Sequence, residues 1–85
     1  MTIEETLDAR EKTHGDFEKV SMVAQEIKGI VSENATHTVS VEKREAIDMI
    51  ATKIARIVCG NPNDPDHWLD IEGYARLVRE RIENE

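Results

Sequence analysis

Two acidic side chains in the middle of the chain, Glu45 and Asp48, stand three residues apart, and Asp70 follows in the next segment. Positions three apart are neighbours on a helix, so Glu45 and Asp48 can point at one place. Carboxylates from facing helices, completed by water and phosphate, bind Mg²⁺ in nucleotide sites. The spacing predicts a Mg²⁺ site in which Asp48 and Asp70 converge on a shared pocket. The alternative is a solvated polar face.

Two cations, Lys53 and Arg56, follow the acidic pair with K-x-x-R spacing. Arginine can hold phosphate oxygens with two parallel hydrogen bonds, and lysine acts on phosphate as a point charge. We therefore expect both side chains to bind phosphate. They could also be two surface cations, or form a structural ion pair with nearby Asp48.

Three residues of the last segment, His67, Asp70 and Tyr74, have the spacing of one helix edge. A carboxylate beside an imidazole can orient it as a metal ligand or a general base. The simpler interpretation, which we favour for His67, is a surface residue in the first turn of a helix. His14, in a turn, is a further candidate for reaching a ligand. The predicted nucleotide- or phosphate-binding residues are thus Lys53, Arg56, His14, His67 and Tyr74, and no catalytic residue is identified.

Apolar residues recur at steps of three and four along most of the chain, which predicts helices. We expect one all-α domain over residues 1–85, a small antiparallel bundle of three to four helices that is completed by oligomerisation. The expected helices are a marginal N-terminal one over 1–13 and main helices over 16–32, 41–59 and 65–83.

Cap residues and glycines delimit these helices. Suitable N-cap residues are Thr2, Asp16, Ser40 and Asp64. Gly15 and Gly60 are expected to end helices, Gly60 in the left-handed conformation that glycine tolerates. Two stripes are expected to form the core, namely Ile47, Ile50, Ala51, Ile54, Ile57 and Val58, and Trp68, Ile71, Ala75, Val78 and Ile82.

The composition and net charge of the chain limit the classes of partner that we expect it to bind. The net charge of −7 argues against the backbone of a nucleic acid as the main partner, because phosphate binding requires a basic face. The single cysteine, Cys59, excludes an internal disulfide and suits the cytoplasm. No apolar run approaches the roughly 20 residues of a membrane span, so no membrane partner is expected. A chain this small gains from self-association, so we expect a homo-oligomer.

Three motifs resemble those of a known group of proteins. They are T-H-G-D-F at 13–17, I-D-M-I-A-T-K-I-A-R at 47–56 and D-H-W-L-D-I-E-G-Y-A at 66–75. Small phage and prophage proteins of unknown function carry a similar His-Gly turn, K-x-x-R helix and D-x-x-x-D-x-x-G-Y helix. The resemblance covers 13–77, and the last motif is its most specific part. This group is in turn similar to the all-α nucleoside triphosphate pyrophosphohydrolases of the MazG type.

The resemblance implies a metal set and a reaction. MazG-type enzymes act as dimers or tetramers, bind Mg²⁺ through E-x-x-E and E-x-x-D pairs and cleave between the α- and β-phosphates. Glu45 and Asp48 would match the first pair, and Asp70 the aspartate of the second. His67 stands where a second glutamate is expected, which leaves one anionic ligand fewer.

Three functions follow from these observations. The leading hypothesis is a phage-type nucleotide-binding protein in the cytoplasm of a bacterial host, acting as a Mg²⁺-dependent pyrophosphohydrolase. The second is a non-catalytic protein that sequesters a nucleotide as an anti-defence measure. The third is a helical interaction module that binds a host protein.

Overall fold

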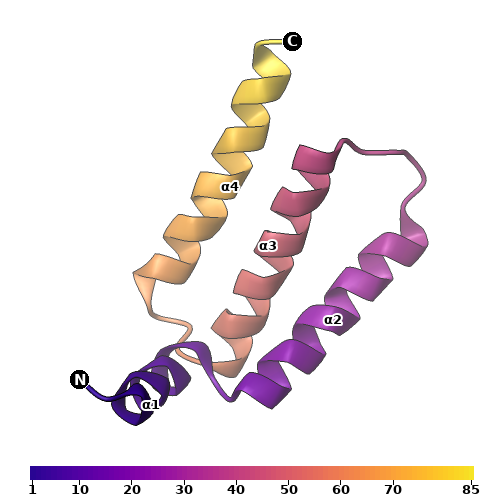
Figure 1. Cartoon of the computed structure of the whole chain (residues 1–85). Coiled ribbons are helices and arrows are strands. Elements are labelled where there is room, and N and C mark those ends of the chain that lie inside the picture. Colours follow the sequence, from indigo (N-terminus) through magenta and orange to yellow (C-terminus); the bar gives the residue numbers. More distant parts are fainter.

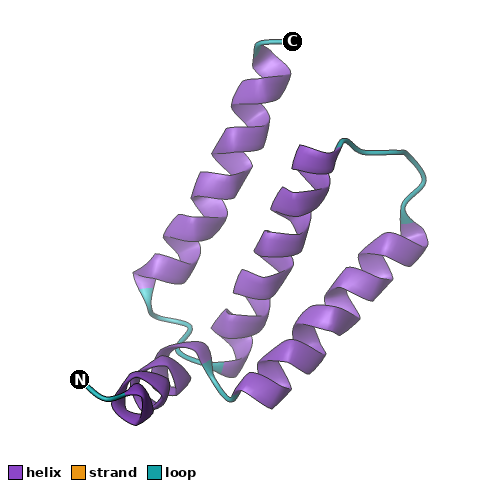
Figure 2. Cartoon of the chain, in the orientation of Figure 1, coloured by secondary structure: helices purple, strands orange, loops and turns teal.

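The computed structural model describes residues 1–85 and contains four helices and no strand (Figure 1, Figure 2). The helices are α1 (Ile3–His14), α2 (Phe17–Asn34), α3 (Val41–Cys59) and α4 (Pro65–Glu83). The all-α prediction is confirmed. Helix α2 continues two residues beyond the expected end, and the Asn34 side-chain amide donates to the Ile30 carbonyl in its last turn.

Each helix begins directly after a predicted cap residue. The side-chain oxygens of Thr2, Asp16 and Ser40 accept a hydrogen bond from the backbone N–H three residues later. The Asp64 side chain accepts from the backbone N–H of Asp66 instead. A cap of this kind contributes roughly 0.5–2 kcal/mol, because it satisfies an N–H that has no partner within the helix.

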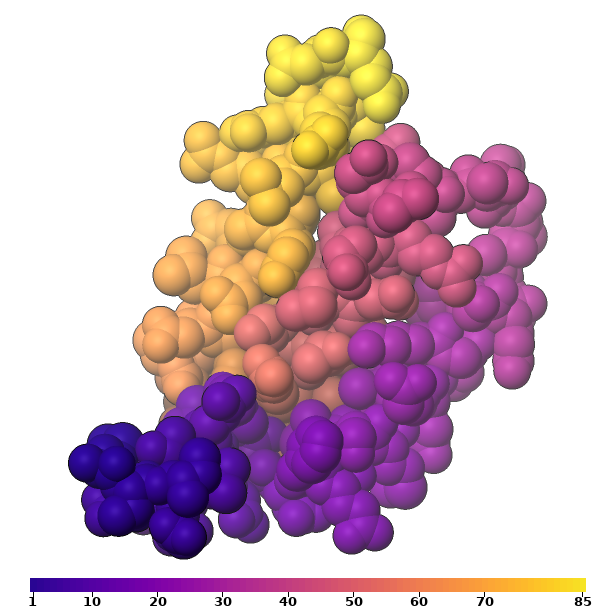
Figure 3. All heavy atoms as spheres, in the orientation of Figure 1, coloured from indigo at the N-terminus to yellow at the C-terminus, as the bar shows by residue number.

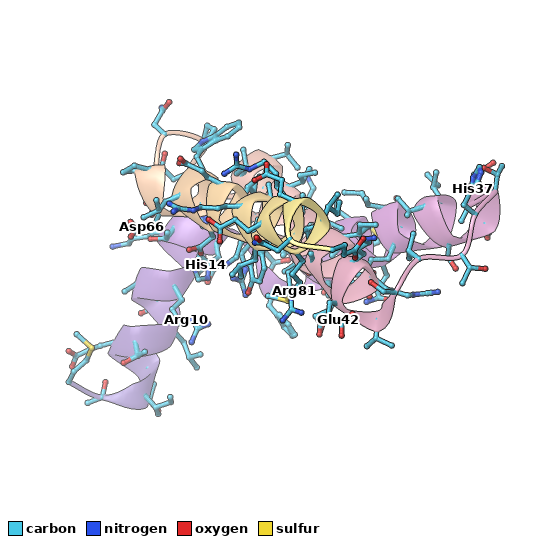
Figure 4. The ribbon with its side chains drawn as sticks, turned by 90° about the horizontal axis from the view of Figure 1, so that it is seen from above. Arg10, His14, His37, Glu42, Asp66 and Arg81 are labelled. Carbon is cyan, nitrogen blue, oxygen red and sulfur yellow. The ribbon has the colours of Figure 1, made fainter.

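Three of the helices form a flat layer in which α3 lies between α2 and α4. Helix α3 contacts both neighbours along its length, whereas α2 and α4 do not contact each other. Figure 4, seen from above, shows α1 projecting from one face of this layer. Helix α3 is therefore covered on both flanks and α2 and α4 each on one, while the faces of the layer are open wherever α1 does not lie.

The core within one chain is small. Only seven of the 85 residues are buried, and four of these are alanines. Val20 and Ala24 of α2 pack on Ala55 of α3, with Val23 and Cys59 beside them. Alanines let the helix axes come close, but they remove little apolar surface from water.

The stripes expected to form the core are enclosed only in part by this chain. Ile47, Ile54 and Val58 of α3 are between 37% and 66% exposed, and Trp68 of α4 is 55% exposed. The expectation of burial was right for Ala51 and Ile57 and wrong for these four residues. The physical reason is the flat layer, which gives α3 two flanking neighbours but no cover over its face.

The ends of α1 and α3 meet in a backbone contact between Thr13–Gly15 and Cys59–Asn61, which we call the glycine junction. Gly15 ends α1 with a positive φ of 89°. Gly60 has φ −116° and ψ −130°, so the prediction of a left-handed conformation was wrong. A Cβ on Gly60 would overlap the Thr13 carbonyl oxygen, so glycine is required here for close approach.

Candidate functional site

A hollow of about 750 Å³ lies between α1, α2 and α3. In Figure 3 the surface is notched between the indigo atoms of α1 and the purple atoms of α2. Residues from all three helices line the hollow, among them Arg10, His14, Phe17, Lys28, Thr52 and Arg56. Sites for small molecules have volumes of about 300–1,000 Å³, so a nucleotide-sized ligand fits.

Three cations line the hollow and have no acidic partner. Arg10, Lys28 and Arg56 take part in none of the ion pairs of the structure. Two carboxylates also line it, Glu11 and Asp16, and Asp16 is engaged as the cap of α2. In a chain of net charge −7, a local excess of unpaired cations is unusual. It makes the hollow a place where an anion is attracted.

The pKa of His14 is affected by its burial and by the cations around the hollow. Partial burial lowers the pKa of His14, and the positive charge of Arg56 lowers it further, with smaller effects from His67, Arg10 and Lys53. The ring of His14 is therefore neutral near pH 7, since its ordinary pKa is 6.5. The share of this shift that comes from the neighbouring cations, rather than from burial, also favours negative charge on a ligand beside His14.

Lys53 is held by an acidic residue outside the hollow. Its ammonium donates to the Asp70 carboxylate at 2.8 Å, and only 11% of the Lys53 side chain is exposed. This hydrogen bond, together with the positive charge, holds the pKa of Asp70 below its ordinary value. The predicted ion pair of Lys53 thus exists, but its partner is Asp70 and not Asp48.

The structure does not bring together the carboxylates predicted to hold Mg²⁺. No group of three or more His, Cys, Asp or Glu side chains is placed to bind a metal ion. Asp48 lies two turns before Ala55 and so shares the flank of α3 that packs on α2. Asp70 approaches α3 from α4, on the opposite flank. A single Mg²⁺ therefore cannot be bound jointly by Glu45, Asp48 and Asp70 of one chain.

His67 is a buried structural residue, and its interpretation as a surface residue was wrong. It is only 2% exposed, and its Nε2 lies 3.0 Å from the Thr13 carbonyl oxygen. A carbonyl can only accept, so Nε2 carries the proton and donates. The His14 ring lies 5.2 Å away, centroid to centroid. His67 thus fastens the end of α1 to the start of α4, outside the lining of the hollow.

Tyr74 also lies away from the hollow. It follows His67 by two turns, is half-buried, and belongs to the flank of α4 that packs on α3. Of the five predicted phosphate-binding residues, the hollow brings together two, His14 and Arg56. Lys53, His67 and Tyr74 lie outside it.

Most residues of the hollow were not predicted as site residues, among them Arg10, Phe17 and Lys28. Arg10 stands four residues before His14, so the two share one face of α1, and Figure 4 shows both on that helix. This spacing could have indicated Arg10. Lys28 follows Phe17 by eleven residues, or about three turns, so these two also share a face. Phe17 is 79% exposed at the edge of the hollow.

No protein-family model, curated protein or solved structure significantly matches the chain. The resemblance to phage proteins and to MazG-type enzymes therefore stays a prediction, and the functional argument depends on the geometry. None of the four helices combines the length and apolar composition that crossing a bilayer requires.

Proposed function

We propose that the chain binds a small phosphate-bearing ligand of nucleotide type in the hollow. The observation that carries this proposal is the set of three cations around the hollow, Arg10, Lys28 and Arg56, which have no acidic partner in the structure. A phosphate in the hollow would accept charge-assisted hydrogen bonds from these cations.

The rest of the lining suits a base and sugar. Leu7 and Val20 offer apolar surface, and the exposed ring of Phe17 offers a face on which a base can stack. Stacking of a base on an aromatic side chain contributes about 1–3 kcal/mol. Arg56 is half-buried and can hold a phosphate with two parallel hydrogen bonds, and Lys28 adds a point charge.

Sequestration without turnover is the form of this function that the geometry favours. The negative charge of Asp70, the metal ligand predicted on α4, is already compensated by its ion pair with Lys53. The carboxylates of one chain do not gather as a set that could hold Mg²⁺. A MazG-type pyrophosphohydrolase remains the catalytic version of the proposal, and a homo-oligomer in the cytoplasm of a bacterial host is its proposed setting.

Arg56→Ala is expected to weaken nucleotide binding by tenfold or more, because hydrogen bonds between charged groups contribute about 1.5–3 kcal/mol. Thermal shift with mixed nucleoside triphosphates and cyclic dinucleotides measures this, since a ligand that binds only the folded chain raises the Tm. Arg76→Ala is the matched control, because Arg76 is an exposed arginine of α4 that is paired with Glu80.

Two results would contradict binding in the hollow. One is a thermal shift that Arg56→Ala and wild type share equally, and the other is no shift with any of these nucleotides. Chromatography of the ligand after denaturation separates the two forms of the proposal. An unaltered ligand supports sequestration, whereas release of pyrophosphate with Mg²⁺ supports hydrolysis.

Nucleotide binding is expected to tighten as the pH falls toward the pKa of His14 in the free protein, which lies below 6.5. An anionic ligand offsets the cations that lower the pKa of His14, so this pKa rises on binding and a proton is taken up. Calorimetry in buffers of different ionisation enthalpy measures the uptake. His14→Asn should abolish it, and affinity that increases with pH would refute this account.

The lowered pKa of His14 also determines how the stability of the free protein changes with pH. Below pH 6.5 the unfolded chain binds the His14 proton more readily than the folded chain does. The contribution of His14 to stability is therefore fully present above pH 6.5 and is lost as the pH falls through the lower, folded-state pKa.

A further inference from the structure

The face of the layer opposite α1 carries a line of exposed aliphatic side chains on α3. Ile47, Ile54 and Val58 follow one another at steps of seven and four residues, so they share one side of α3. Arg56, which lines the hollow, is two residues from both Ile54 and Val58 and hence roughly 160° around the helix from each. The aliphatic line and the hollow therefore lie on opposite faces.

The neighbouring helices extend this line on both sides. On α2, Ile30 is 63% exposed and lies two residues from Lys28 of the hollow, again roughly 160° around. On α4, Trp68 and Ile82 are at least half exposed and belong to the second predicted stripe. We define the apolar face as Val23, Ile27 and Ile30 of α2, Ile47, Ile54 and Val58 of α3, and Trp68, Ile71, Ala75, Val78 and Ile82 of α4.

The surface area of the chain is larger than that of a compact monomer of its size. The chain exposes 6526 Å², whereas a folded monomer of 9.7 kDa is expected to expose about 5,100 Å². The excess of about 1,400 Å² is larger than the roughly 800 Å² that each partner buries in a standard interface. The radius of gyration of 14.7 Å likewise exceeds the value of about 12 Å for a compact chain of 85 residues.

We propose that a second copy of this chain packs its own apolar face against this one, about a two-fold axis. A chain that buries seven residues has too little core to remain folded alone, so it needs its cover from the moment it folds. Another copy of the chain is the partner that is always present. A two-fold interface uses the same patch twice, which an aliphatic surface satisfies.

The dimer has a definite architecture. Two three-helix layers enclose the two apolar faces as one core, which is a standard two-layer arrangement. Helix α1 and the hollow lie on the outside of each layer, so both hollows stay open. The dimer therefore does not depend on the ligand, and failure of one proposal leaves the other intact.

The mass of the protein in solution tests this proposal. Light scattering after gel filtration should give twice the 9.7 kDa of one chain for wild type, and 9.7 kDa for Ile54→Lys with its helical circular dichroism retained. Leu77→Lys is the matched control. Leu77 is an exposed leucine nine residues from Trp68, hence about 180° around α4, and this variant should keep the wild-type mass.

Three outcomes of the mass measurement overturn the proposal. They are a wild-type monomer, an assembly of any size that Ile54→Lys leaves intact, and equal dissociation by Ile54→Lys and Leu77→Lys.

Quenching of tryptophan fluorescence tests whether the apolar face is covered, even if Ile54→Lys does not fold. Trp68 is the only tryptophan, lies on the apolar face, and is 55% exposed in a single chain. A tryptophan at position 77, made by Leu77→Trp with Trp68→Phe, replaces a side chain that is 59% exposed on the opposite face. Acrylamide should quench Trp68 severalfold less than the tryptophan of that variant. Equal quenching would show that the apolar face is open to solvent.

Discussion

Gly60→Ala is expected to lower the free energy of unfolding by about 2–4 kcal/mol, because the added methyl group has no room. It would overlap the Thr13 carbonyl oxygen and the carbonyl carbon of His14. These are backbone atoms of α1, which cannot rotate away as the end of a flexible side chain would. Moving them also disturbs the hydrogen bond from the Asn61 N–H to the Thr13 carbonyl. Urea denaturation followed by circular dichroism, at one protein concentration, measures the loss.

Gly73→Ala is the matched control and should change the free energy of unfolding in the opposite direction. A Cβ on Gly73 meets nothing within 4 Å, and the residue lies inside α4. Alanine in a helix interior is favoured over glycine by about 1 kcal/mol, so this variant should be as stable as wild type or more so. If Gly60→Ala and Gly73→Ala gave the same change, the close contact at the glycine junction would be refuted.

The helices could be predicted because their signals are local. Thr2, Asp16 and Ser40 each cap a helix by accepting from an N–H only three residues away. A window of a few residues contains all the physics of such a cap, and the spacing of apolar residues adds the rest. This is why every helix begins within two residues of the start that the sequence predicts.

The site could be predicted only in part, because its contacts join distant residues. Lys53 pairs with Asp70 on another helix, and His67 bonds to Thr13 across 54 positions of sequence. Periodicity shows which residues share a side of a helix, but it does not show which neighbour lies on that side. Asp48 and Asp70 were therefore expected to converge, whereas α2 and α4 hold them on opposite flanks of α3.

The apolar stripe of α3 is a second case in which periodicity does not identify the neighbour that covers a helix. The spacing of Ile47, Ile54 and Val58 predicts an apolar surface on one side of the helix. It carries no information on whether the cover comes from the same chain or from another copy. In the structure the flanks of α3 are filled by α2 and α4, and the face with this stripe is left open.

The attachment of α1 is the weakest point of the fold. No residue of α1 is buried, and both Ile3 and Leu7 are mostly exposed. The helix is held chiefly at its last turn, where the Thr13 carbonyl accepts from both the Asn61 N–H and the His67 Nε2–H. Because α1 supplies Arg10 and His14 to the hollow, this attachment also controls the proposed binding site.

His67→Ala is accordingly expected to cost about 3 kcal/mol, through the cavity left by a buried ring and the loss of its hydrogen bond. His37→Ala is the control, since His37 is exposed and bonds only to neighbouring Thr36, and it should change stability by less than about 0.5 kcal/mol. Hydrogen exchange should show α1 losing protection while α2 and α3 keep theirs. Nucleotide binding should weaken in parallel, although His67 does not line the hollow. A variant as stable as His37→Ala, with α1 still protected, would mean that something other than His67 holds this helix in place.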